Sequence, residues 1–280
     1  LGLATAHKTQ RTTGAPQCLA APKPLTDLLP YRLTGAQARV IDEIGRDMAS
    51  DIPMRRIVVG DVGCGKTVCA AAAMYIAVAS GRQAVLMAPT EILARQHFSD
   101  LEPLFARLGI DCALLVGATP AAEKRRIKAA LSADDPAARL NVVIGTHALI
   151  SDGVEFAAPG IIVTDEQHRF GVTQRATLAQ KNKSAHVLVM SATPIPRSLA
   201  LVMYGDLDIS RIDEMPPGRQ RVDTFVVDEG YRARLDSFIE KLCAAGGQVY
   251  IVCPAIEERE CEENEISMSE ISLFREPEEA

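Results

Sequence analysis

The sequence lacks the features that mark membrane, secreted and cysteine-ligated metal proteins. Trp is absent, and the seven cysteines include no C-x-x-C pair. An odd number of cysteines without such pairs is typical of a reducing compartment, and it does not favour a disulfide framework or a metal site. The longest uncharged run, residues 67–81, is rich in Ala and falls short of the roughly 18 residues that a membrane span needs. The N-terminus has no apolar signal core, so we expect a cytoplasmic protein that does not associate with membranes.

Excess basic charge is also missing, but the distribution of charge matters more than its total. Residues 256–280 contain ten Glu and two Arg, which gives this segment a net charge of −8. Because the whole chain carries −6, the rest of the chain carries +2. A surface that contacts DNA is therefore compatible with the composition. The acidic segment has few aromatics and no clear periodicity, so we expect residues 257–280 to be disordered.

Apolar residues are plentiful, at 48% of 280 residues, which is enough for one large α/β domain and part of a second. Short Val/Ile/Leu runs alternate with helical patterns, as in a parallel sheet that is covered on both faces. The strands are expected at residues 56–59, 84–88, 112–116, 141–144, 161–164 and 187–190, and the helices at residues 35–49, 67–80, 91–108 and 121–131.

Turn signals divide the chain into further segments. Residues 1–30 mix Thr, Gln, Pro and Lys without periodicity, which predicts a linker or a disordered lead-in. The α/β domain is expected over residues 31–214, and the cluster Pro216-Pro217-Gly218 ends it. Residues 215–256 are expected to begin a second α/β unit, in which strands at 224–227 and 249–252 flank a helix at 231–245.

A phosphate-binding loop is the strongest local signal. It follows an apolar strand and opens a helix, as a P-loop does, with the sequence Gly60-Asp61-Val62-Gly63-Cys64-Gly65-Lys66-Thr67. The glycines let backbone N–H groups turn toward a phosphate, and the helix N-terminus adds a favourable dipole. Lys66 would reach the β and γ phosphates, and the Thr67 hydroxyl would ligate Mg²⁺. This pattern predicts a site for ATP and Mg²⁺.

Two adjacent carboxylates, Asp165 and Glu166, follow the apolar strand at residues 161–164. Ligands bind at the carboxyl ends of strands in open α/β sheets. Asp165 would hold Mg²⁺ through its water shell, and Glu166 would orient or deprotonate the water that attacks the γ-phosphate. Such a pair alone is more often a solvated turn, but together with a P-loop it favours nucleotide hydrolysis.

These segments, together with SATPIPR at residues 191–197, resemble the superfamily 2 helicases, with DEQH (residues 165–168) in the place of their second motif. The resemblance implies a RecA-like P-loop NTPase domain followed by the beginning of a second RecA-like domain. It extends to LTGAQ (residues 33–37), PTEILARQH (residues 89–97) and GTHALI (residues 145–150). The order of these motifs makes the match specific.

The resemblance implies a fuller set of roles for individual residues. The catalytic set would be Lys66, Asp165, Glu166 and His168. Gln37 would read the adenine base, and Gly60, Gly63, Gly65, Lys66 and Thr67 would hold the phosphates, with Thr67 and Asp165 at the metal. DNA would contact Thr90, Arg95, Gln96, Thr146 and His147, and coupling between ATP and DNA would involve Ser191, Thr193 and Arg197. His7, His97 and His186 are interpreted as ordinary positions, because none of them has a second ligand at metal spacing, and a contact on the DNA side stays open for His97.

Within the superfamily, DEQHRFGV at residues 165–172 is similar to both the RecG family and the transcription-repair coupling translocases. The stretches YGDLDIS (residues 204–210) and IDEMPPGR (residues 212–219) resemble RecG. Cys64 replaces the usual Ser of that family, and Ser198 the usual Thr, both small changes. The chain starts at Leu1 rather than Met, and the resemblance stops after Glu258. We therefore expect a piece that covers the first motor lobe and the start of the second, without the arginine fingers and without the N-terminal wedge domain.

The RecG resemblance implies an ATP-dependent DNA helicase that remodels stalled forks and recombination junctions. The expected partner is branched or forked DNA, the expected cofactors are ATP and Mg²⁺, and the protein is expected to be a monomer. Two alternatives stay open from the residues themselves. One is a translocase that displaces a stalled polymerase, and the other is a remnant that binds nucleotide or DNA without turnover.

Overall fold

The structure is a computed structural model, and it describes residues 14–150, 153–165, 184–192, 207–216 and 224–253. The chain divides into two compact units, residues 1–220 and 221–280. None of the helices in the described part has the length and apolar character that a membrane crossing requires.

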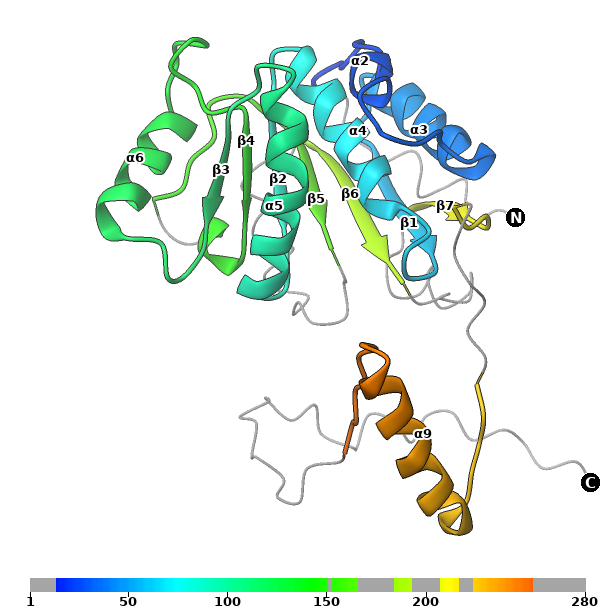
Figure 1. Ribbon diagram of the computed structural model, residues 1–280. Helices are drawn as coiled ribbons and strands as arrows, with labels where there is room; N and C mark the ends of the chain where they lie inside the picture. Colours follow the sequence, from blue (N-terminus) through cyan, green and yellow to red (C-terminus); the bar gives the residue numbers. More distant parts are fainter. Residues whose placement is uncertain (1–13, 151–152, 166–183, 193–206, 217–223, 254–280) are drawn as a thin grey trace, which may run out of the picture. The chain divides into compact units, whose positions relative to one another are not determined.

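The first unit is built on a parallel sheet (Figure 1). Within the described residues the sheet has seven strands in the order β3-β4-β2-β5-β6-β1-β7, and every strand pair is parallel. Parallel strands end at the same edge, so the segments that follow them gather along one side of the sheet. The strands are β1 (Arg55–Gly60), β2 (Gln83–Met87), β3 (Cys112–Leu115), β4 (Val142–Gly145), β5 (Pro159–Thr164), β6 (His186–Ser191) and β7 (Asp208–Ile212).

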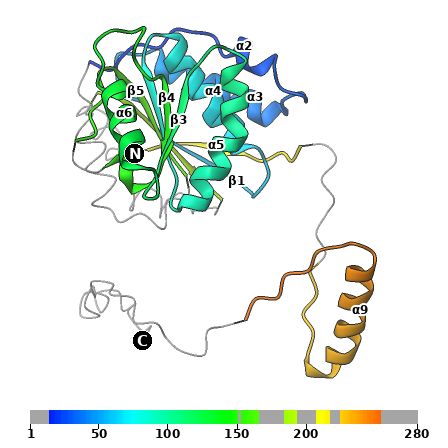
Figure 2. The same ribbon diagram turned by 60° about the vertical axis from the view of Figure 1, so that its left-hand side comes forward.

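Helices cover both faces of this sheet, as the sequence predicts (Figure 2). The face that carries Leu86 packs against α3 (Gly35–Met48), α4 (Lys66–Ala79) and α5 (Glu91–Ala106). On the opposite face, the neighbouring strand residues Val85 and Met87 pack against α6 (Ala121–Leu131). Two apolar cores therefore form on the two sides of strands that are buried throughout, which confirms the doubly wound α/β fold.

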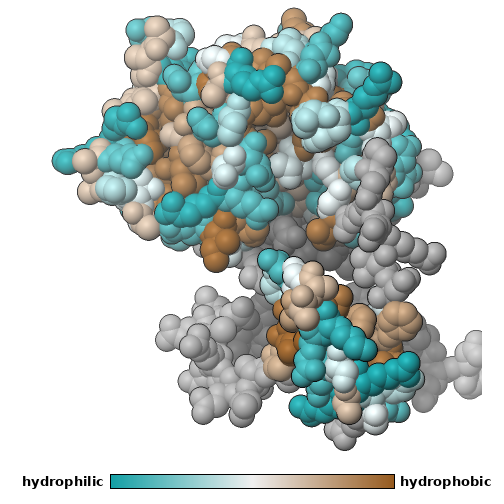
Figure 3. All heavy atoms as spheres, in the orientation of Figure 1, coloured by the Kyte–Doolittle hydropathy of each residue, from teal (hydrophilic) through white to brown (hydrophobic). Residues whose placement is uncertain are grey.

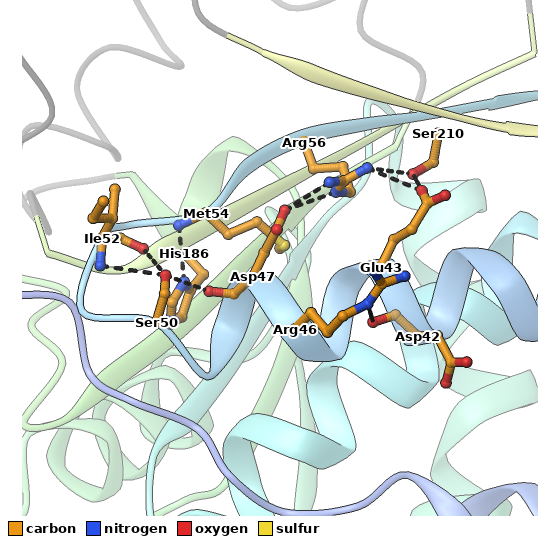
Figure 4. A network of polar contacts seen from close by, with 10 residues as sticks. All are labelled: Asp42, Glu43, Arg46, Asp47, Ser50, Ile52, Met54, Arg56, His186 and Ser210. Atoms are coloured by element: carbon orange, nitrogen blue, oxygen red, sulfur yellow. Dashed lines mark hydrogen bonds and ion pairs between the residues drawn. The ribbon is translucent and has the colours of Figure 1, made fainter. Parts of the chain in front are cut away.

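A buried arginine anchors α3 to the sheet (Figure 4). The Arg56 guanidinium on β1 lies 2.8 Å from Asp47 Oδ2 and 3.1 Å from Glu43 Oε2, both on α3. It also donates to Ser210 Oγ on β7 at 2.6 Å, and Ser210 in turn donates to Glu43. A largely buried charge needs several partners. Because the partners of Arg56 lie on α3 and β7, this network fixes α3 against β1 and β7.

The two acidic residues that directly follow β7 also hold α3 in place. Glu214 Oε2 accepts a hydrogen bond from Ala36 N at 3.1 Å, in the first turn of the helix, and Arg39 pairs with Asp213 at 2.9 Å. A carboxylate at a helix N-terminus satisfies a free N–H group and complements the helix dipole. The start of α3, which carries Gln37, is therefore braced from β7.

Residues 14–30 correct one expectation. The sequence predicts a linker there, but the structure packs this stretch onto the first unit. Cys18 and Leu25, the latter in the short helix α2 (Lys23–Thr26), are fully buried. The backbone N–H of Cys18 donates to Met48 O at 2.8 Å. Single apolar anchors in an irregular backbone produce no periodicity, so the pattern of the sequence does not reveal them.

The second unit contains a 3₁₀ turn, η3 (Glu229–Tyr231), and the helix α9 (Arg232–Ala244). The helix agrees with the expected one, but the strands expected at 224–227 and 249–252 are wrong for the described structure, which assigns no strand there. A β-strand is assigned only where its backbone forms hydrogen bonds to a neighbouring strand. Nothing in the described part of this unit pairs with either segment. Apolar side chains are exposed on this unit (Figure 3). Those on α9 include Leu235 and Phe238.

Candidate nucleotide-binding site

The loop between β1 and α4 has the backbone that a phosphate cradle needs. Gly63 has φ 80° and Gly65 has φ 90°, both in the left-handed region that favours glycine. A Cβ on Gly60 would lie 2.5 Å from Cys64 Sγ, and a Cβ on Gly65 would collide with the side-chain nitrogen of Gln37. Gly65 is also the N-cap of α4 and supplies no side-chain cap. The loop therefore keeps first-turn N–H groups of α4 available for an anion.

Lys66 and Thr67 open α4 beside this loop. The Lys66 ammonium donates to Gly60 O at 2.7 Å and to Asp61 O at 3.0 Å, so it closes over its own loop. These are bonds to neutral carbonyls, which a phosphate oxygen can replace with a stronger charge-assisted bond. Thr67 follows in the first turn and is partly exposed. The loop thus has the expected residues at the expected helix end.

Asp165 lies directly after β5, two strands from β1 in the sheet. Its backbone N–H donates to Met87 O of β2 at 3.0 Å, which continues the parallel ladder by one residue. Its side chain meets His97 of α5, with Nε2 of His97 2.6 Å from Oδ2 of Asp165. Both residues are less than a tenth exposed. His97, which the sequence offers no reason to single out as a ligand, thus contacts the expected metal ligand Asp165.

Gln37 joins α3 to the phosphate loop. Its Oε1 accepts from Thr34 N at 2.9 Å within a capping box, and its Nε2 donates to Cys64 O at 2.8 Å. The side chain is buried. Both ends of the amide are therefore engaged, and in this structure Gln37 supports the loop. Each end of the amide has one further hydrogen-bonding site, so the adenine contact that the resemblance implies is compatible with these bonds.

The residues expected to contact DNA fall into two groups. Arg95 and Gln96 on α5 and His147 in η1 (His147–Leu149) are exposed, and Arg95 pairs with Glu91 at 2.7 Å. Thr90 instead caps α5, accepting from Leu93 N at 3.3 Å. Thr146 is buried at the end of β4, and its hydroxyl has no hydrogen-bond partner in the described structure. A direct contact between the Thr146 side chain and DNA therefore does not fit this structure.

The coupling and catalytic residues are only partly described. Ser191 ends β6 and is fully buried, between the end of β5 and the phosphate loop in the sheet order. The remaining expected residues lie outside the described part of the chain: Glu166, His168, Thr193 and Arg197.

The oxygen donors at this edge fit Mg²⁺ bound together with a nucleotide. Mg²⁺ commonly takes one or two protein ligands and completes its octahedron with phosphate oxygens and water. A Thr67 hydroxyl and an Asp165 carboxylate make such a set. In the part of the chain that the structure describes, no three His, Cys, Asp or Glu side chains form a cluster that could hold a metal without such help.

Comparisons with known proteins agree with this geometry. Residues 34–202 match the family model of DEAD/DEAH box helicases. The ATP-dependent DNA helicase RecG of Synechocystis sp. is 51% identical over 235 residues, which cover 84% of this chain and 28% of that protein. RecG of Bacillus subtilis is 47% identical over 230 residues, 82% of this chain and 33% of that protein. The chain thus spans 28% and 33% of the length of these curated relatives.

Solved structures give the same result for the fold. A structure of RecG bound to a three-way DNA junction is similar with a TM-score of 0.78 and 42% identity, covering 91% of this chain and 34% of that one. The crystal structure of the helicase MrfA shares the fold, with a TM-score of 0.59 at 16% identity and coverage of 84% and 38%. The RecA-like fold that the motifs implied is therefore confirmed.

Proposed function

The chain belongs to the DEAD/DEAH box helicase family, in its RecG branch, and on this premise we propose that it is the nucleotide-binding part of an ATP-driven DNA motor that acts on branched DNA. The observation that carries the proposal is the phosphate loop at the end of β1, on the same sheet edge as Asp165. A sheet edge with a P-loop and a carboxylate two strands away is suited to phosphoryl transfer.

Each residue at this edge has a definite task in that reaction. Lys66 exchanges its bonds to the loop carbonyls for the β and γ phosphates, and α4 adds the positive end of its dipole. Thr67 and Asp165 would hold Mg²⁺, and a bound Mg²⁺ would supply positive charge to offset the charge that develops on the phosphates. Glu166, the next residue in the sequence, would orient the attacking water; it lies outside the described residues, as does His168.

The DNA side of the proposal rests on exposed residues that follow other strands at the same carboxyl edge of the sheet. Arg95, Gln96 and His147 are exposed just beyond β2 and β4. Cations and amides of this kind contact the phosphates and sugars of DNA. A three-way junction is bound by the similar RecG structure, and we assign branched DNA to the protein that carries this chain.

The test uses Lys66→Ala, with the exposed Lys23→Ala as a matched loss of charge. Calorimetry with Mg²⁺ and a non-hydrolysable ATP analogue should show that Lys66→Ala loses about 1.5–3 kcal/mol of binding, or roughly 10–100-fold in affinity, because a charge-assisted bond disappears. Lys23→Ala should bind like the original chain.

The DNA arm replaces the matching segment of the Bacillus subtilis relative with this chain. We expect the chimera to hydrolyse ATP faster with a three-way junction than with linear duplex. The Lys66→Ala chimera should hydrolyse ATP with neither DNA. Equal rates with both DNAs would contradict the branched-DNA assignment, and unchanged nucleotide affinity in Lys66→Ala would contradict the nucleotide site.

A further inference from the structure

Helix α5 carries one polar residue on its inner face. Its buried residues are Ala94, His97, Leu101 and Phe105, a spacing that places all four on the side facing the sheet. Three of them are apolar and pack in the core. A buried imidazole at such a position is costly unless its polar atoms find partners. Apolar packing alone therefore does not explain why a histidine stands at position 97.

The partner of His97 is the expected metal ligand. Nε2 of His97 lies 2.6 Å from Oδ2 of Asp165, and the two side chains are only 10% and 13% exposed. A carboxylate oxygen can only accept, so Nε2 carries the hydrogen and donates it. A short bond of this kind between buried groups restricts the rotation of the carboxylate. It engages Oδ2 and makes no bond to Oδ1.

The geometry points to His97 as a positioning residue that holds Asp165 in the orientation required by nucleotide-bound Mg²⁺. This inference rests on the function proposed above, and it concerns a contact made by a second helix, outside the phosphate loop and outside the strand that carries Asp165. Partners that hydrogen-bond a ligating side chain fix its direction, and their loss commonly reduces metal affinity about 10–100-fold.

The arrangement of the elements favours a role for His97 in orienting the Asp165 carboxylate rather than in attaching α5 to the sheet. The helix is already attached to the sheet by its apolar residues Leu101 and Phe105, both buried in the main core. Asp165 is the first residue after β5, and its backbone N–H still bonds to Met87 O, but this bond does not fix the direction of its side chain. The imidazole fixes that direction from the side.

The test measures how nucleotide binding depends on Mg²⁺. A fluorescent ATP analogue is titrated into the chain at a series of Mg²⁺ concentrations and in EDTA. In His97→Leu, which keeps an apolar side chain on the inner face of α5, we expect the half-saturating Mg²⁺ concentration to rise about tenfold or more. Affinity for the analogue in EDTA should stay unchanged.

Two further variants separate positioning from folding. His97→Gln retains an N–H donor and should restore the Mg²⁺ dependence to within about threefold of the original, while the exposed Ser99→Ala on the same helix should change nothing. In an Asp165→Asn background, His97→Leu should cause no additional shift, since the two residues act on one metal.

The outcomes distinguish this inference from the proposed function. If the original chain fails to bind the analogue with Mg²⁺, the proposed function is wrong. If it binds and His97→Leu shows the original Mg²⁺ dependence, or if His97→Leu shifts the Asp165→Asn chain equally, His97 only braces the helix and the inference is wrong.

Discussion

Several buried polar side chains join separate elements of this fold, and His186 is one of them. It is fully buried at the start of β6. Its Nδ1 accepts from Met54 N at 2.9 Å, and its Nε2 donates to Pro16 O at 2.8 Å. Only the neutral ring with hydrogen on Nε2 satisfies both bonds. The residue thus joins β1, β6 and the stretch before α2, and it plays no part in the nucleotide site.

The pKa of His186 is lowered by burial, and the bond to the Pro16 carbonyl opposes that shift only in part. The unfolded chain therefore takes up the proton first as pH falls through about 6.5, and the folded chain takes it up only at lower pH. Stability is highest above that value and falls below it, by at most about 1.4 kcal/mol per pH unit.

We predict that urea unfolding between pH 7.5 and 5.5 shows this loss. In His186→Asn, whose Oδ1 can still accept from Met54, the loss should be smaller, while the exposed His147→Asn should keep the original pH dependence. Equal slopes for the original chain and His186→Asn would rule out His186 as the source.

The residues of the nucleotide site differ in how far the sequence predicts them. Lys66, Thr67 and Asp165 stand in local patterns, a loop before a helix and a carboxylate after a strand, so they are found without the fold. The His97–Asp165 pair joins residues 68 positions apart, and the Gln37–Cys64 pair joins residues 27 apart. Only the packing of α3 and α5 brings these pairs together.

At the scale of elements, the expected strands and helices of the first unit agree with the structure to within a few residues, because buried parallel strands are continuous apolar runs. The edge strand β7 was missed. Its sequence Asp-Ile-Ser-Arg-Ile contains only two apolar residues, which are separated by two polar ones, so it forms neither a continuous apolar run nor a regular alternation. The contacts of Ser210 and Glu214 with α3 depend on this strand and could not be predicted without it.

The junction of the phosphate loop, α3 and α4 gives an element-scale prediction through Gly65. An alanine there faces two costs, a left-handed backbone and a collision with the Gln37 amide. Gly81 provides a matched control, because it has a similar φ of 75° but nothing within 4 Å of an added Cβ. The backbone cost alone is about 1–2 kcal/mol.

We predict that Gly81→Ala loses about 1–2 kcal/mol of unfolding free energy in urea titrations and keeps nucleotide affinity. Gly65→Ala should lose more and should also bind the ATP analogue weakly. Adding Gln37→Ala should recover part of the stability of Gly65→Ala, because the collision partner is removed. Equal destabilisation by the two alanines would show that the Gln37 contact carries no energy.

At the scale of the whole molecule, the described nucleotide site belongs entirely to the first unit. Its residues, from Gln37 to Ser191, and both main cores lie within residues 1–220. The sequence predicts a boundary at the Pro216-Pro217-Gly218 cluster, since such residues interrupt regular structure. It does not predict the attachment of residues 14–30, which depends on single side chains such as Leu25 reaching the core.

This organisation predicts that a variant ending at Gln220 folds and binds nucleotide by itself. A unit that contains its own core can fold alone, and β7, whose Ser210 bonds to Arg56 and whose Ile212 lies in the core, is retained. We expect its affinity for the ATP analogue with Mg²⁺ to stay within about twofold of the full chain, as for changes remote from a site.

A second variant ending at Leu207 removes β7, leaves the Arg56 charge with fewer partners and exposes Val58 and Val59 of β1 at a new sheet edge. It should unfold at a markedly lower temperature in circular dichroism and lose nucleotide binding with the fold. If the variant ending at Gln220 instead loses binding while staying folded, residues 221–280 contribute directly to the nucleotide site.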